Sequence, residues 1–298
     1  MMVDINKSPN QLGGVENSLN DVYLTKEYNG QTFTSKVKCE LYNDHFENAK
    51  RYNIPHAQLI IADIPYNLGN NAYASNPMWY EDGDNKNGES KLAGKTFFKT
   101  DENFNIGNFF DFCTRYLNKE PKTPNTAPAM IVFCAFEQMN MVIEEGKKHG
   151  LVKSYPLIFI KNFSAQVLKA NMKIVGATEY AVVLYRDKLP KFRNNGKMVF
   201  NWMEWVKDTK TEKIHPTQKP VPLLERLIEI FTDEGDVVID PCAGSGSTLI
   251  AARNLKRHSY GFEIEKEFYS KAIDLINGTS ETEKKLKKQG ITTIFDFL

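Results

Sequence analysis

The chain has 298 residues, of which 41% are hydrophobic and 25% charged, and its formal net charge is +1. This composition is typical of a soluble globular protein with one large domain or two small ones. With a mean hydropathy of -0.45 and no apolar run near the roughly 20 residues of a membrane helix, we expect no membrane contact. The first residues show no secretion signal, and the four cysteines lack metal-ligand spacing. We therefore expect a cytoplasmic protein without a metal site or disulfides.

The charge is unevenly distributed along the chain. Residues 146–219 contain 15 Lys and Arg but only 5 Asp and Glu, whereas the segments before and after them are acidic. A basic middle is a candidate surface for a polyanion. The alternative is a set of solvated charges that are balanced in the folded protein.

Seven short runs rich in β-branched and aromatic residues alternate with helical patterns. The strands are predicted at residues 37–42, 58–62, 130–136, 157–160, 180–184, 237–239 and 259–262. The clearest helical spacing of apolar residues lies at 222–231, 247–255 and 266–276. Several strands are apolar on both faces, which is typical of a sheet covered by helices on both sides. The pattern therefore predicts an α/β fold with a largely parallel sheet.

Three segments do not follow this alternation. Residues 1–35 are polar and rich in Asn and Gly, and we interpret them as an N-terminal extension before a folded domain at 36–298. Residues 67–107 form a long loop with interspersed aromatic residues, of the kind that covers an active site. Residues 186–214 are basic and contain two tryptophans.

The strand predicted at 237–239 leads into Asp240-Pro241-Cys242-Ala243-Gly244-Ser245-Gly246 and then a helix. Glycines let a ligand approach the backbone closely, and the start of a helix offers unpaired N–H groups. About 20 residues further on, Glu263 ends the next strand, where an acid binds ribose hydroxyls in nucleotide-binding α/β folds. The turn lacks the complete glycine pattern of dinucleotide sites and the Gly-Lys-Ser/Thr of a phosphate loop. A tight turn without a ligand is the alternative.

Two further motifs bring polar groups to the end of a strand and the start of a helix. The run Leu59-Ile60-Ile61-Ala62 ends in Asp63-Ile64-Pro65-Tyr66, which places a carboxylate and an aromatic ring at the sheet edge. An acceptor beside a ring suits a flat substrate that bears an amino group. The turn His215-Pro216-Thr217-Gln218-Lys219-Pro220 could hold a carboxylate or phosphate at the start of a helix. Taken alone, each motif also fits a proline-terminated strand or a capped helix.

Together these motifs resemble those of the β-group of DNA amino-methyltransferases. Asp63-Ile64-Pro65-Tyr66 is similar to their DPPY motif, with Ile64 where the family has proline. The turns at 215–220 and 240–246 resemble the family's methionine-end and glycine-loop motifs. The catalytic motif precedes the cofactor motif, which is the circularly permuted order of this group. The resemblance covers residues 37–276 and implies a Rossmann-like methyltransferase fold, with a seven-stranded, mostly parallel sheet and helices on both faces.

The resemblance also implies S-adenosylmethionine as the cofactor and double-stranded DNA as the partner. Asp63 and the carbonyl of Pro65 would accept hydrogen bonds from the target amine, and Tyr66 would stack on a flipped-out base. Glu263 would bind the ribose of the cofactor, Asp44 its adenine and Lys219 its carboxylate. The cofactor-binding residues that the resemblance implies are Asp44, Asp63, Thr217, Lys219, Asp240, Cys242, Gly244, Ser245, Gly246 and Glu263.

The chemistry of the implied reaction suits these side chains. The lone pair of a ring amine is delocalised, and two acceptors on its N–H groups favour a pyramidal nitrogen that can attack the methyl group. Alignment then contributes most of the catalysis, without a metal or a covalent intermediate. In this group the target-recognition region corresponds to the basic segment 186–214, where Lys188, Lys191, Arg193 and Lys197 would contact DNA phosphates.

Asp63 favours N6 of adenine as the methyl acceptor, because cytosine-N4 enzymes of this group commonly carry serine there. Cytosine-N4 methylation is the alternative within the class. Enzymes that act on RNA or protein glutamine are disfavoured, since they carry asparagine at that position and lack the permuted order. Ile64 motivates the hypothesis of a DNA-binding relative with weak catalysis, and a nicotinamide-dependent dehydrogenase is a further alternative. A homodimer and a cognate restriction endonuclease are the other predicted partners.

Overall fold

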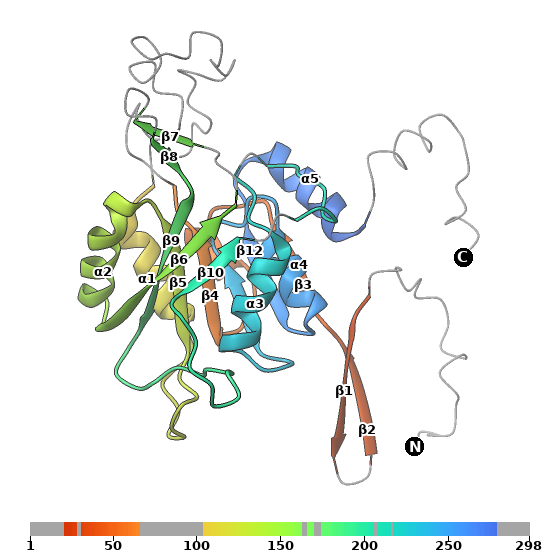
Figure 1. The fold of residues 1–298 in the computed structure, drawn as a ribbon. Helices are drawn as coiled ribbons and strands as arrows, with labels where there is room; N and C mark the ends of the chain where they lie inside the picture. The colour runs from red at the N-terminus through yellow and green to blue at the C-terminus, as the bar shows by residue number, and fades with distance from the viewer. Residues whose placement is uncertain are drawn as a thin grey trace, which may run out of the picture.

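The computed structural model describes residues 21–28, 31–65, 104–162, 166–169, 174–205, 208–215 and 217–278. Its centre is an eight-stranded sheet in the order β10-β6-β9-β5-β4-β11-β12-β3, flanked by helices (Figure 1). β9 runs antiparallel to β5 and β6, and the other neighbouring pairs in this sheet are parallel. The predicted α/β fold with a mostly parallel sheet is thereby confirmed. The strands are β3 (Cys39–Tyr42), β4 (Leu59–Asp63), β5 (Ala129–Cys134), β6 (Lys153–Lys161), β9 (Thr178–Tyr185), β10 (Trp202–Trp205), β11 (Val237–Asp240) and β12 (His258–Phe262).

The sheet has one strand more than the seven predicted. All seven predicted strands are present, and the eighth, β10, lies within the basic segment and pairs in parallel with β6. Four residues with alternating exposure carry too little periodic signal to predict a strand. They become one because the outer edge of β6 offers unpaired N–H and C=O groups, and β10 satisfies these groups.

Alternate residues of the central strands face two separate cores. In β4, Leu59 and Ile61 belong to one apolar cluster, whereas Ile60 and Ala62 belong to the other. Each of the four is at most 1% exposed, so the strand is a continuous apolar run in the sequence. The first face is covered by α3 (Val221–Phe231), α4 (Ser247–Asn254) and α5 (Lys266–Ile276), and the second by α1 (Ile106–Tyr116), α2 (Met139–Lys148) and the short 3-10 helix η2 (Phe46–Arg51).

The predicted N-terminal extension contains regular structure in its described part. β1 (Tyr23–Tyr28) and β2 (Gln31–Lys36) form an antiparallel hairpin outside the main sheet (Figure 1). Leu24 is buried and lies beside Gly235. This contact connects the hairpin to the domain. From Tyr23 onward the predicted extension is therefore part of an ordered hairpin.

The loop predicted at 67–107 ends in a helix, since α1 begins at Ile106. Residues 66–103 lie outside the described residues, and with them the predicted base-stacking residue Tyr66. A second hairpin, β7 (Gln166–Lys169) and β8 (Ile174–Gly176), connects β6 to β9. No helix in the described ranges is long and apolar enough to cross a membrane.

The first part of the basic segment lies at the amino ends of the parallel strands. The antiparallel strand β9 ends there, and the carbonyl of Leu189 accepts a hydrogen bond from the N–H of Ala127, just before β5. The C-terminal edge of the sheet, where α/β folds bind ligands, is at the other ends of these strands. Residues 186–193 are thus placed away from that edge.

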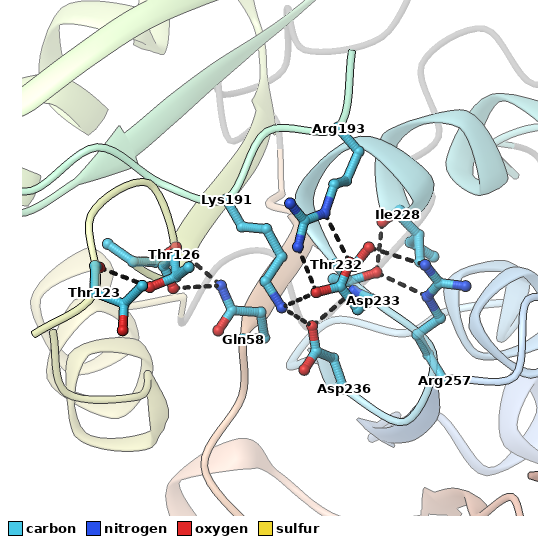
Figure 2. A network of polar contacts seen from close by, with 11 residues as sticks. Gln58, Thr123, Thr126, Lys191, Arg193, Ile228, Thr232, Asp233, Asp236 and Arg257 are labelled. Atoms are coloured by element: carbon cyan, nitrogen blue, oxygen red, sulfur yellow. Dashed lines mark hydrogen bonds and ion pairs between the residues drawn. The ribbon is translucent and has the colours of Figure 1, made fainter. Parts of the chain in front are cut away.

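An ion-pair network fastens this part of the segment to the loop before β11 (Figure 2). Lys191 Nζ lies 2.6 Å from Asp236 and 2.8 Å from Asp233. Arg193 binds Asp233 through two N–H groups, at 2.7 and 2.6 Å. We call these four residues the far-edge network. The cations of this network already have carboxylate partners, which argues against the predicted phosphate contacts of Lys191 and Arg193.

Candidate active site

A cavity of about 300 Å³ lies at the carboxyl ends of β4, β11 and β12. The loops after these three strands and the turn before α3 form its walls, because parallel strands bring their carboxyl ends to one edge of the sheet. The cavity thus unites three motifs that are up to 200 residues apart in the chain. Of the predicted site residues, Asp63, Pro65, Thr217, Lys219, Asp240, Cys242, Gly244, Ser245 and Glu263 line it.

The turn after β11 presents a buried carboxylate to this cavity. The N–H of Cys242 donates to Asp240 Oδ1 at 3.0 Å, which folds the turn back over the end of the strand. Burial raises the pKa of Asp240 to about 7, and the neighbouring Asp63 adds to this effect. Burial also raises the pKa of the Cys242 thiol, so this cysteine is neutral and lines the wall rather than acting as a nucleophile.

The two glycines of the turn have different roles. Both have positive φ angles, 51° for Gly244 and 73° for Gly246, which favour glycine. Gly244 lines the cavity opposite the ring of His215. Gly246 does not line it: it caps α4 and faces Ile276 of α5, where a Cβ atom would lie 3.2 Å from the Ile276 side chain. In this structure Gly246 therefore contributes to the packing of α4 on α5, and its predicted cofactor contact stays a prediction.

Glu263 enters the cavity from the end of β12. The N–H of Glu265 donates to its carboxylate at 2.7 Å, and Asn43 donates to its backbone carbonyl at 2.8 Å. Burial raises the pKa of Glu263 to about 7. A buried acceptor of this kind gains most from ligand groups that carry N–H or O–H donors.

Asp44 is not among the residues that line the cavity. Its carboxylate accepts hydrogen bonds from the N–H of His45 at 2.8 Å, from Asn48 at 2.7 Å and from the hydroxyl of Tyr52 at 3.0 Å. It thus binds the nearest donors of η2, as an acid beside a helix start commonly does. The cavity is lined instead by the next two residues, His45 and Phe46.

The strand end with Asp63 is held by backbone hydrogen bonds. The N–H of Ile64 donates to the carbonyl of Phe133 at 3.2 Å and extends the pairing of β4 with β5. A proline has no N–H, so Ile64 retains a contact that the family's usual residue would lack. The side chain of Gln138 donates to the carbonyl of Pro65 at 3.0 Å, and its oxygen accepts from the N–H of Ala135.

The turn before α3 contributes His215, Thr217 and Lys219. The ring of His215 packs against Phe268 with 4.4 Å between the ring centroids, and its Nδ1 lies 3.1 Å from the Thr217 hydroxyl. Burial and the positive charges of Lys219 and Lys213 lower the pKa of His215 to about 4, so its ring is neutral near pH 7. Lys219 Nζ donates to Asp63 Oδ2 at 2.6 Å, which joins this turn to the end of β4.

Some lining residues were missed because the sequence carries no signal for them. Phe104 and Phe268 come from segments that only the fold brings to the cavity. Gln138 and Glu179 do not line it, but they contact Pro65 and Lys219, which do. Lys188, another predicted phosphate contact, donates to the carbonyl of Pro121 at 2.8 Å. Within the described ranges, no group of three or more His, Cys, Asp or Glu side chains could hold a metal ion.

This cavity, with its glycine turn and three acids at strand ends, lies where Rossmann-like folds bind their ligands. Comparisons with known proteins identify the family. A family model described as DNA methylase, of the N6/N4 methyltransferases, matches residues 57–274. The chain therefore belongs to this family, as its motifs predict. The β-group resemblance is confirmed, and so is S-adenosylmethionine as the family's cofactor.

Curated relatives match shorter stretches. The type II methyltransferase M.BglII of Bacillus subtilis is 43% identical over 67 residues, which are 22% of this chain and 19% of the relative. M2.DpnII of Streptococcus pneumoniae is 40% identical over 101 residues, 33% of this chain and 38% of the relative. The matched stretches thus span well under half of these relatives.

Solved structures show the same fold over most of the chain. The M1.HpyAVI-SAM complex matches with a TM-score of 0.58 and 22% identity, over 80% of this chain and 98% of that one. PvuII DNA methyltransferase, described as cytosine-N4-specific, matches with a TM-score of 0.56 and 14% identity, over 83% and 89% of the two chains. At these identities the likeness establishes the Rossmann-like fold.

Proposed function

We propose that this protein transfers a methyl group from S-adenosylmethionine to N6 of an adenine that is flipped out of duplex DNA. The observation that carries the proposal is the position of Asp63, at the end of β4, in the same cavity as Asp240 and Glu263. A carboxylate that can accept from an amine thus lies beside the carboxylates that can hold a nucleoside.

The cofactor end of the cavity is formed by the loops after β11 and β12. When bound, S-adenosylmethionine supplies a methyl group on a positively charged sulfur. Glu263 is suited to accept hydrogen bonds from its ribose hydroxyls, and the turn from Asp240 to Ser245 lets its chain pass close to the backbone. Thr217 and Lys219 offer a hydroxyl and an ammonium group to its carboxylate.

The base end is formed by Asp63 and Pro65. Both accept hydrogen bonds, and two acceptors on one amine direct its lone pair away from the ring and toward the methyl group. Gln138 holds the Pro65 carbonyl by one hydrogen bond, and a carbonyl oxygen has a second lone pair for the substrate. Tyr66 follows Pro65 in the chain and is the proposed stacking partner of the base.

DNA must be distorted for this reaction, because an amine inside a duplex cannot reach a cavity at a sheet edge. We therefore include base flipping in the proposal. A cytoplasmic location, a homodimer and a cognate restriction endonuclease belong to it as well. The curated relatives are described as type II methyltransferases, which supports the link to restriction.

The test is to incubate the protein with S-adenosylmethionine and DNA of mixed sequence and to analyse the nucleosides by mass spectrometry. N6-methyladenine is the expected product. N4-methylcytosine would overturn the choice of base and assign the alternative reaction. DNA binding without any methylated product would instead make the chain a weakly catalytic relative. Sequencing of the modified positions would identify the recognition sequence.

A further inference from the structure

Four charged side chains form a largely buried cluster where the cavity meets the neighbouring ends of strands β6 and β9. Lys219 Nζ lies 2.6 Å from Asp63 Oδ2 and 3.3 Å from Glu179 Oε2. The other oxygen of Glu179 pairs with Lys161, at the end of β6. We call Asp63, Lys161, Glu179 and Lys219 the site cluster.

The cluster is largely removed from water. The side chain of Lys219 is 8% exposed, that of Lys161 12% and that of Glu179 20%. Lys161 lies 4.8 Å from the centroid of the Trp205 ring, and Lys219 lies 5.2 Å from that of Phe133. A buried ammonium group is costly unless a carboxylate balances it, so the partners of Lys219 determine where its charge is directed.

Glu179 is ionised at neutral pH. Burial alone would raise its pKa, but Lys219 and Lys161 outweigh that effect and hold the pKa below the usual value of a glutamate. Lys219 is therefore placed between two carboxylates, Asp63 on one side and Glu179 on the other. An ammonium group has three N–H donors, so it can serve both carboxylates.

The antiparallel strand β9 explains how Glu179 reaches this place. β9 starts at Thr178, on the same sheet edge where the parallel strands β4 and β6 end, because its direction is reversed. Glu179 is paired in register with Phe159 of β6. A parallel strand at this position would have placed its first residues at the opposite edge, beside the far-edge network.

Resting on the proposed methyl transfer, we propose that Glu179 is a positioning residue that acts through Lys219. Glu179 forms an ion pair with the Lys219 ammonium group and thereby weakens the interaction between Lys219 and Asp63. Asp63 must accept hydrogen bonds from the substrate amine, and an ammonium group committed to Asp63 alone would compete with that amine. Glu179 thus adjusts the acceptor strength of Asp63 without touching the substrate.

Glu179 pairs with two cations, Lys161 and Lys219, and the experiment uses a second variant, at Lys161, to tell their effects apart. Glu179→Gln keeps the shape and removes the charge. We expect kcat for methyl transfer to fall at least tenfold, while the Kd of S-adenosylmethionine changes less than threefold. Lys161→Met should lower kcat by a smaller factor. The double variant Lys161→Met/Glu179→Gln should stay as slow as Glu179→Gln, because Lys219 still lacks its second carboxylate.

Two kinetic outcomes overturn the inference. If the double variant recovers the kcat of the parent, Glu179 serves only to balance Lys161, and its role is structural. If Glu179→Gln stays within twofold of the parent kcat, Lys219 does not need it. Asp236→Asn is the matched control, since it removes one carboxylate from a buried ion pair in the far-edge network. It should lower the unfolding temperature and leave kcat within twofold.

A second measurement does not depend on methyl transfer, so it can also be made when the protein is inactive. Thermal unfolding of Glu179→Gln, Lys219→Met and their double variant gives the coupling between the two side chains. Shifts that are clearly less than additive show that Glu179 and Lys219 are energetically coupled, as the inference requires, and additive shifts overturn the inference. If the parent transfers no methyl group, the proposed function fails while this coupling is still measured. For a variant that does not fold, Glu179→Asp takes the place of Glu179→Gln.

Discussion

The two edges of the sheet each hold two cations and two carboxylates, yet they differ in what surrounds them. In the far-edge network, Asp236 Oδ2 also accepts the N–H of Asp233 at 2.7 Å within the loop before β11. The ion pairs of Lys191 and Arg193 tie that loop to the segment after β9 (Figure 2). In the site cluster, Asp63 and Lys219 line a cavity. Similar charges therefore stabilise the fold at the amino ends of the strands and border a ligand site at the carboxyl ends.

The strand directions account for this difference. Parallel strands end at one edge, where their loops carry Asp63, Asp240 and Glu263, and the reversed strand β9 adds Glu179 to the same edge. The loops that return from the helices enter the strands at the amino-terminal edge of the sheet. The polar groups there bind one loop to another. We infer that the position of a charge along the strand axis, more than its type, separates function from stability in this protein.

The largest expected difference between the two edges is in catalysis. Asp63→Ala should lower methyl transfer by about 10²–10³-fold, the usual loss when one preorganised electrostatic contact is removed. Asp236→Ala should leave the rate per folded molecule within about twofold and lower the free energy of unfolding by roughly 1–3 kcal/mol, since it removes charged hydrogen bonds. Mass spectrometry of nucleosides and urea unfolding measure the two effects. Equal losses of activity in both variants would contradict the comparison.

A smaller expected difference is in how the stability contributed by each edge depends on pH. The pKa values of Asp240 and Glu263 are raised to about 7 by burial. These carboxyls therefore favour folding fully below their ordinary pKa, and that contribution is lost as pH rises through about 7. Arg193 instead lowers the pKa of Asp233, so the contribution of Asp233 is present above its ordinary pKa and lost as pH falls below it.

Binding of S-adenosylmethionine should reflect the acids of the site. If both must ionise to accept its donors, the affinity rises with pH up to about 7, by up to about tenfold per pH unit for each carboxyl. Glu263→Gln should make this dependence shallower, whereas Asp233→Asn should leave it unchanged. Calorimetric titration at several pH values measures the slope. A slope in Glu263→Gln as steep as in the parent would remove Glu263 from the binding reaction.

The smallest expected effect concerns the salt dependence of DNA binding. Arg193→Gln should change the slope of log K against log salt by less than about one, because Arg193 is already paired with Asp233. Lys210 and Lys213 are exposed and precede the turn that lines the cavity. Their joint replacement by glutamine should reduce the slope by about one to two. Equal changes in both variants would place DNA at the far edge as well.

Much of this architecture was predictable from local patterns. The apolar runs located seven strands because buried strands need such runs whatever their partners are. The motifs with Asp63, Asp240 and Glu263 predicted the cavity, since each acid directly follows a strand and parallel strands end at one edge. Asp44 also follows a strand, but its carboxylate accepts hydrogen bonds from donors in and beside η2, and the sequence pattern alone does not show those partners.

The amino-acid sequence by itself determined the family, the alternation of strands and helices, and the acids of the cavity, because these depend on residues that are adjacent in the chain. Only the tertiary structure decided which charges meet. Lys191 and Glu179 lie in the same basic stretch of the sequence, but the two ends of the antiparallel strand β9 lead to opposite edges of the sheet. One side chain therefore closes a structural ion pair, and the other lies beside Lys219 and the cavity, since pairing between distant segments sets both positions.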